Sequence, residues 1–143
     1  MSRPPRPAYR PGRSLKPLRH PRLWAVLWCL AIAAVVVSSL MPAPPLPDFE
    51  GSDKWSHFLA YFALAASAVQ LFRGWPALLG AGLGLVLLGI GIEYAQGTLT
   101  VDRVAETKDA LANTLGVIAG LATRLTPLHD LLARIDGLGT GPR

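Results

Sequence analysis

The first long apolar run, residues 23–41, constrains the fold of this chain more than any other feature. It has no charged side chain and is long enough for one helix to cross the hydrocarbon core of a bilayer. The chain of 143 residues is 51% hydrophobic and only 16% charged, whereas about a quarter is usual in soluble domains. A signal peptide is disfavoured, because the run is long for one and Pro42-Ala43-Pro44-Pro45 is a poor cleavage site. We therefore expect an uncleaved membrane anchor.

Three further apolar segments follow, and turn and capping residues mark their boundaries. Ser52 or Asp53 and Thr107 are candidate N-caps, and Pro76 suits the first turn of a helix. The fourth segment is the shortest and least hydrophobic. The pattern predicts an all-α integral membrane four-helix bundle with short loops, whose spans cover about 23–41, 55–72, 75–94 and 109–125.

The distribution of charge predicts the orientation of these spans. Residues 1–22 contain seven basic side chains and no acid, which is typical of a disordered basic arm on the cytoplasmic side. The loops 42–54 and 95–109 are net acidic and fall on the opposite side. We therefore expect a multi-pass protein of the bacterial inner (plasma) membrane with both termini cytoplasmic. Nucleic-acid binding is disfavoured, because no folded basic module follows the arm.

The last segment, residues 126–143, is expected to be a cytoplasmic tail with a short amphipathic helix. After Thr126-Pro127, one helical face of residues 126–136 carries only leucine and isoleucine side chains. That face would lie along the membrane surface or pack against the bundle. Its apolar residues are Leu128, Leu131, Leu132 and Ile135.

Small residues at a spacing of four indicate where helices approach closely. Gly80 and Gly84 share a face of the third span, and Gly116 and Gly120 share a face of the fourth. Such pairs favour close packing in a bilayer, where lipid offers no hydrophobic drive for association. We expect these four glycines to form packing seams.

Ionisable and amide side chains gather at the ends of the apolar segments, where they are costly unless they have a role. Following the chain back and forth across a bilayer places all of them at one membrane face. The predicted polar cluster comprises Asp53, Lys54, His57, Tyr61, Glu93, Gln96, Arg103, Asp109 and Asn113.

Three interpretations of this cluster are open. Lys54 and Arg103, near helix ends, suit an anion such as a lipid phosphate or carboxylate. His57 as general base and Glu93 as general acid would suit an intramembrane enzyme acting on a lipid-linked substrate. Alternatively, the same side chains hold the bundle together as a purely structural polar cluster.

Local spacing predicts neither a metal site nor a cofactor. The chain has no H-E-x-x-H motif, phosphate loop or nucleophile elbow, so the usual short catalytic signatures are missing. Cys29 is the only cysteine, which excludes an intrachain disulfide or a cysteine metal cluster. A non-enzymatic role is therefore favoured.

The order of these polar residues resembles the VanZ-like family of small bacterial membrane proteins. The residues that carry the resemblance are Asp53-Lys54-Trp55-Ser56-His57-Phe58 with Tyr61, Glu93-x-x-Gln96, Arg103, and Asp109 with Asn113-Thr114-Leu115-Gly116. The match covers roughly residues 23–123. Asp102 stands where the family usually has a glycine, and the following loop is more charged. A member of this family is associated with resistance to the glycopeptide antibiotic teicoplanin.

Taken together, the residues and the resemblance predict a membrane protein that binds or handles an anionic envelope lipid or a lipid-linked cell-wall precursor at the periplasmic face. Membrane lipids are the expected partners, and the oligomeric state is left open. In this hypothesis Arg103 and Lys54 receive the anion. The side chains expected to orient it are those of His57, Tyr61, Gln96 and Asn113.

Overall fold

A computed structural model of the chain describes residues 14–42, 51–101 and 105–137. Within these ranges every regular element is helical, which confirms the expected all-α class. The predicted disorder of residues 1–13 and the proline-rich loop at 43–50 lie outside the described residues. The five helices are α1 (Pro21–Leu40), α2 (Ser52–Leu71), α3 (Trp75–Leu99), α4 (Thr107–Ala122) and α5 (Leu131–Gly137), and the 3-10 turns Thr123–Leu125 and Pro127–Asp130 join the last two.

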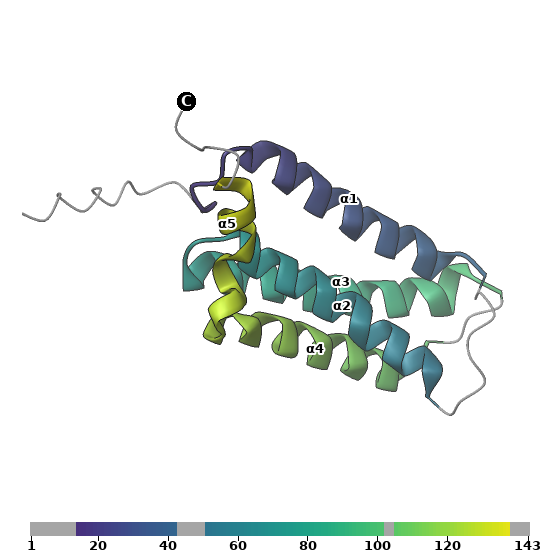
Figure 1. The fold of residues 1–143 in the computed structure, drawn as a ribbon. Helices are drawn as coiled ribbons and strands as arrows, with labels where there is room; N and C mark the ends of the chain where they lie inside the picture. The colour runs from purple at the N-terminus through teal and green to yellow at the C-terminus, as the bar shows by residue number, and fades with distance from the viewer. Residues whose placement is uncertain (1–13, 43–50, 102–104, 138–143) are drawn as a thin grey trace, which may run out of the picture.

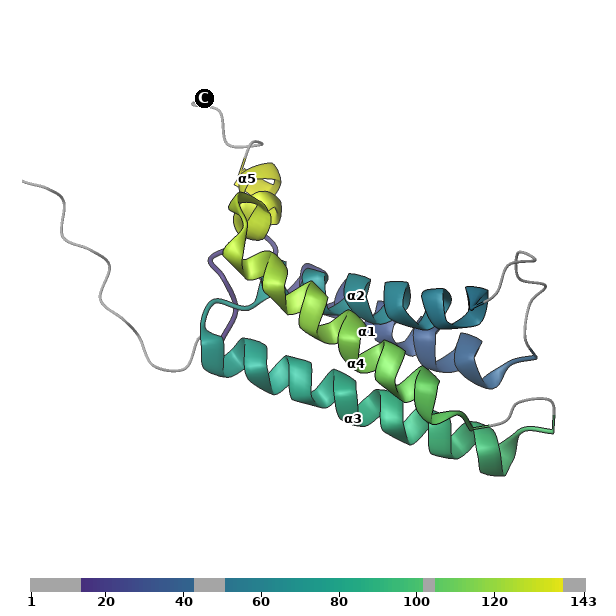
Figure 2. The ribbon, with the colours of Figure 1, turned by 90° about the horizontal axis from the view of Figure 1, so that it is seen from below.

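The four long helices lie side by side with alternating direction (Figure 1). We call the end at which α2 and α4 begin and α1 and α3 finish the rim end, and the opposite end the collar end. Seen from below, α4 lies over both α2 and α3 (Figure 2). The short α5 crosses the collar end near the start of α1 (Figure 1). The N-terminal turns of two helices and the C-terminal turns of two others therefore meet at the rim end.

The helix boundaries lie close to the predicted ones, with one extension. The N-caps differ, however: they are Gly51 for α2 and Glu106 for α4, whereas Ser52, Asp53 and Thr107 lie in the first turns of these helices. Pro76 lies in the first turn of α3, and Gly51, at φ 81°, precedes α2 in a conformation that favours glycine. Helix α3 runs past its predicted end at residue 94 to Leu99. The extra turn is stabilised at Thr100, whose backbone N–H and hydroxyl both donate to the carbonyl of Gln96.

Two of the described helices are long and apolar enough to cross a membrane. These are α1, with mean hydropathy 2.4, and α3, with mean hydropathy 2.0. None of the residues of α1 is buried within the chain, and most of its leucine and valine side chains are exposed, among them Leu23, Leu30 and Val37. The buried apolar core lies instead on α2, α3 and α4, around Tyr61, Leu85 and Val117.

Helices α2 and α4 pack backbone against backbone. A Cβ atom at Gly120 would lie 2.6 Å from the carbonyl oxygen of Phe62, and one at Gly116 would clash with the carbonyl oxygen of Phe58. Only glycine therefore permits this approach, which matches the seam expected on the fourth span.

The seam expected on the third span lies elsewhere. No described atom comes within 4 Å of a Cβ built at Gly80 or Gly84. The glycines of α3 that contact neighbours are Gly82, against Leu121, and Gly89, against Asn113 and Tyr61. The predicted seam of Gly80 and Gly84 is therefore wrong within the described residues, because a spacing of four does not tell which face of α3 meets α4.

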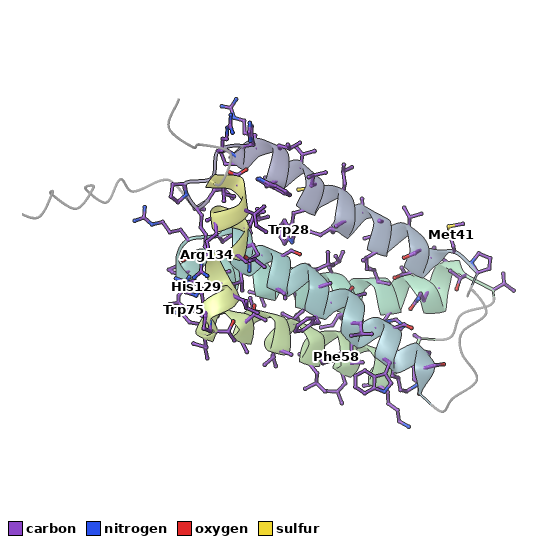
Figure 3. The ribbon with its side chains drawn as sticks, in the orientation of Figure 1. Trp28, Met41, Phe58, Trp75, His129 and Arg134 are labelled. Carbon is purple, nitrogen blue, oxygen red and sulfur yellow. The ribbon has the colours of Figure 1, made fainter. Side chains whose placement is uncertain are left out.

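Hydrogen bonds near both ends attach helix α1 to α2 and α3, and Ile32 and Val35 between them pack against the core. Near its start, the Trp28 side chain points from α1 toward α2 (Figure 3), donates from Nε1 to the carbonyl of Leu64 at 2.9 Å, and packs edge-on against Phe72. Near the rim end, Gln96 Nε2 donates to the carbonyl of Ser39 at 2.8 Å. These hydrogen bonds satisfy backbone and side-chain groups that would be costly to leave unpaired in apolar surroundings.

Residues 14–22, which were predicted to belong to a disordered arm, have a defined place in the structure. The Lys16 N–H donates to the carbonyl of Leu71 at 2.7 Å, and the Arg73 N–H donates to the carbonyl of Ser14 at 2.9 Å. A single antiparallel bridge thus forms between Leu15 and Phe72. The segment that starts at Ser14 therefore forms backbone hydrogen bonds with the turn between α2 and α3.

The C-terminal tail closes the collar end over this segment. Lys16 Nζ lies 2.8 Å from Asp130 Oδ1, with the lysine 5% exposed. Trp24 Nε1 and the Arg19 N–H both donate to the Asp136 carboxylate. The Lys16 ammonium holds the pKa of Asp130 below its ordinary value, mainly by hydrogen bonding. The expected amphipathic helix is formed in part by α5, with Leu131, Leu132 and Ile135 lining a groove against α1 and α2.

Substitution at the α2–α4 seam tests its packing. We expect Gly116→Ala to lower the free energy of unfolding by about 2 kcal/mol, because the new methyl group meets backbone that cannot rotate away. Gly84→Ala is the matched control, since its methyl group meets open space and alanine is the better helix former. Thermal unfolding in detergent, followed by circular dichroism, measures both. Equal destabilisation of the two variants would contradict the close approach.

The Lys16–Asp130 pair predicts a pH-dependent contribution to stability. Because the folded-state pKa of Asp130 is lowered, the stabilisation is present above the unfolded-state pKa of the carboxyl group and is lost as the pH falls through the folded-state pKa. We expect Lys16→Met to cost about 1 kcal/mol at neutral pH, since Asp130 is partly exposed. The difference between wild type and variant should disappear in acid. A difference that stays constant across a pH series of melting curves would show that the ion pair is not its cause.

Candidate functional site

The rim end brings together polar side chains from three helices. Helix α2 contributes four of them from its first turns, where positions three and four apart share a face. Helix α3 contributes from its last turns and α4 from its first. The side chains that meet there are Asp53, Lys54, His57, Tyr61, Glu93, Glu106, Asp109 and Asn113.

The outermost part, which we call the outer ring, consists of Asp53, Lys54 and Glu106. Lys54 Nζ lies 3.1 Å from Asp53 Oδ2 and 3.0 Å from Glu106 Oε2. The two carboxylates are 46% and 44% exposed, and the lysine side chain is 33% exposed. The hydrogen bond to Glu106 is the main cause that raises the pKa of Lys54, and the hydrogen bond from Lys54 lowers the pKa of Asp53.

Beneath the ring lies a buried set, the inner group, which consists of His57, Glu93, Asp109 and Asn113. His57 Nδ1 lies 3.1 Å from Asn113 Oδ1 and 4.0 Å from Glu93 Oε1. The other ring nitrogen, Nε2, lies 3.7 Å from Asp109 Oδ2. The histidine side chain is only 14% exposed and that of Glu93 only 7%. The imidazole of α2 is therefore surrounded by one carboxylate from α3 and by a carboxylate and an amide from α4.

Asp109 connects the two parts of the site. Its Oδ1 lies 3.6 Å from Lys54 Nζ in the outer ring, while Oδ2 faces His57 in the inner group. The Asp109 side chain is 12% exposed. A change of charge in the outer ring or in the inner group therefore alters the electrostatic environment of the same carboxylate.

Four buried polar atoms in and beside the inner group have no hydrogen-bond partner among the described residues. These atoms are Tyr61 OH, Glu93 Oε1, Asp109 Oδ1 and Asn113 Nδ2. Leaving a polar atom buried without a partner costs about 1–3 kcal/mol. Native structures contain few such atoms, and several in one place call for a functional explanation.

Two residues of this region were missed by the sequence analysis. Glu106 pairs with Lys54, and its backbone N–H donates to Glu93 Oε2 at 3.2 Å. Its position as the N-cap of α4 was the available signal. Gly89 supports Tyr61 and Asn113, because a Cβ there would lie within 3.3 Å of both. No motif in the sequence marks this glycine.

Two predicted members of the cluster, Gln96 and Arg103, are not assigned to the outer ring or to the inner group. Gln96 is buried but donates to Ser39, so it attaches α1 to α3 instead of joining the inner group. Arg103 lies outside the described residues.

The geometry also groups potential metal ligands. One ligand atom from each of His57, Glu93 and Asp109 lies within 4.8 Å of the other two. A second set, Asp53, Glu106 and Asp109, meets the same limit. The first set combines residues of α2, α3 and α4, and the second combines α2 with the start of α4. Both form only when the helices pack together, which is why the local spacing that predicted no metal site did not reveal them.

Comparison of the chain with family models, with curated proteins and with solved structures finds no match.

Proposed function

We propose that this chain is a VanZ-like, four-span protein of the bacterial inner membrane whose outer ring binds the headgroup of an anionic envelope lipid or lipid-linked cell-wall precursor. Both termini lie in the cytoplasm and the rim end faces the periplasm. The observation that carries the proposal is the set of polar groups at the rim end: a partly exposed ammonium, two helix N-termini and unpaired buried donors.

The membrane location is supported by the outward-facing apolar surface. Helices α1 and α3 meet the length and hydropathy required to cross a bilayer. Large apolar side chains on α2 and α4 are also exposed, among them Leu59, Leu111 and Ile118, which fits lipid better than water. Trp55 and Tyr94 are exposed near the rim end and Trp75 near the collar end, where aromatic side chains suit the two membrane interfaces.

The headgroup proposal is supported by the N-termini of the parallel helices α2 and α4, which both lie at the rim end. Neither helix has a side-chain hydrogen bond at its N-cap, and the dipoles of both helices favour an anion at these ends. Lys54 lies between these two helix starts, bonded to Asp53 at the start of α2 and to Glu106, the N-cap of α4.

An incoming anion must compete with the carboxylates that already contact Lys54. Asp53 and Glu106 are nearly half exposed, and exposed ion pairs contribute only about 0–1 kcal/mol each. A phosphate can therefore displace them at little cost. In this view the two acids set the affinity by competing for the ammonium.

The contacts rank the alternative interpretations. A cluster that served only to hold the helices together is expected to satisfy its own polar atoms, yet four buried atoms lack a hydrogen-bond partner among the described residues. An acid–base enzyme would use His57 and Glu93, whose Nδ1 and Oε1 atoms lie 4.0 Å apart. The teicoplanin link belongs to the resemblance and is a possible cellular readout of headgroup binding.

Lipid binding by the purified full chain tests the proposal. We expect Lys54→Ala to weaken the binding of phosphatidylglycerol or a polyprenyl phosphate about fivefold, equivalent to ~1 kcal/mol. The double variant Asp53→Asn/Glu106→Gln should strengthen it by a similar factor, because the competing carboxylates are gone. Native mass spectrometry of the protein released from detergent measures both effects, with phosphatidylcholine as the zwitterionic comparison.

The matched control is Lys108→Ala, which removes the same charge from the first turn of α4 at an exposed position. Its lipid affinity should stay close to that of wild type. Equal loss in Lys54→Ala and Lys108→Ala would point to general attraction of anions and overturn the site. Chemical turnover of the bound lipid that His57→Gln abolishes would favour the enzyme instead.

Cysteine labelling tests the orientation. In a Cys29→Ala background, a single cysteine at Ser52 should react with a membrane-impermeant maleimide added outside intact inner-membrane spheroplasts, because the rim end faces the periplasm. A cysteine at Arg134 should react only after the membrane is opened. The reverse labelling pattern would contradict the proposed topology.

A further inference from the structure

The inner group has the composition and connections of a metal site. We propose that His57, Glu93 and Asp109 bind one divalent transition-metal cation, such as Zn²⁺ or Mn²⁺, beneath the outer ring. This inference goes beyond headgroup binding and does not depend on it.

The ligand atoms converge from three helices. One atom from each residue lies within 4.8 Å of the other two, and His57 Nε2 lies 3.7 Å from Asp109 Oδ2. Zinc takes ligands at about 2.0–2.2 Å, which separates neighbouring ligand atoms by roughly 3–4 Å. Small side-chain rotations therefore suffice to close the site around an ion.

Each of the three ligands has its second polar atom close to a different neighbour. Asn113 Oδ1 lies 3.1 Å from His57 Nδ1, so that an N–H there leaves the Nε2 lone pair facing Asp109. The Glu106 N–H donates to Glu93 Oε2, which leaves Oε1 without a partner among the described residues. Asp109 Oδ1 lies near Lys54, and Oδ2 faces the imidazole. Outer partners of this kind orient the ligands of metal sites and fix the histidine tautomer.

Charge balance also favours a divalent cation. Two carboxylates buried beside one imidazole are costly unless their charge is balanced, and Glu93 Oε1, which has no hydrogen-bond partner among the described residues, belongs to a side chain that is 7% exposed. A divalent ion neutralises both carboxylates at once.

The second set of ligands is the weaker candidate. Asp53, Glu106 and Asp109 already surround the ammonium of Lys54 at 3.0–3.6 Å. That ammonium supplies the positive charge of the outer ring and repels a second cation. The inner group shares only Asp109 with it.

The donor set selects the class of metal. An imidazole with carboxylates suits zinc, manganese or iron, whereas calcium and magnesium prefer oxygen ligands alone and in larger numbers. Three protein ligands also leave a position for water or for an oxygen of another molecule.

Metal analysis of the full chain in detergent tests this assignment. After loading with Zn²⁺ and gel filtration, we expect one equivalent to remain per chain and to resist an excess of Mg²⁺. The conservative variants His57→Gln, Glu93→Gln and Asp109→Asn should each lose it. Asn113→Ala should keep the ligands but lower the Zn²⁺ affinity about 10–100-fold, because the imidazole loses its orienting partner.

His129→Ala is the matched control, since it removes another histidine that lies 3.0 Å from a carboxylate, Asp130. It should retain zinc as wild type does, and circular dichroism identifies any variant that fails to fold. The proposal is overturned if wild type retains no zinc, if Mg²⁺ displaces it, or if folded Glu93→Gln and Asn113→Ala bind it as tightly as wild type.

Discussion

The packing of α2 directly against α4 is the constraint on which the rest of the structure depends. Glycine at positions 116 and 120 lets α4 approach the backbone of α2 more closely than any side chain would allow. The two helices run in parallel, so their first turns are adjacent, and α3 closes the third side at its last turns. The outer ring and the inner group exist because this approach brings Lys54 to Glu106 and His57 to Asn113.

The opposite end of the molecule depends on backbone pairing rather than on small residues. Residues from Ser14 bond to the turn between α2 and α3, and the tail carrying Asp130 and Asp136 closes over them. Helix α1 itself buries no residue. Its position is set by the hydrogen bonds of Trp24 and Trp28 near one end, by the bond from Gln96 to Ser39 at the other, and by the partly buried Ile32 and Val35 between them.

Sequence reasoning predicted the long helices to within a turn at nearly every boundary, because hydrophobic runs and proline act locally, but the N-caps of α2 and α4 are Gly51 and Glu106 instead of the predicted residues. It also identified most of the rim residues, since polar groups at the ends of apolar segments are exceptional. It missed the role of Glu106, the contacts of Gly89 and the correct glycines of α3. These depend on how α3 and α4 are rotated against each other, which no local pattern encodes. The backbone pairing of the segment after Ser14 likewise depends on Phe72, which is more than fifty residues away in the sequence.

The single carboxylate shared between the two levels has a thermodynamic consequence. Asp109 contacts Lys54 with one oxygen and faces His57 with the other, so an occupant at one level changes the electrostatic environment of the other. Linkage requires that this influence be mutual: if an anion at the outer ring alters the affinity of the inner group by some factor, occupancy of the inner group alters anion affinity by the same factor. Through this one aspartate, the proposed anion site and the proposed metal site would be thermodynamically coupled.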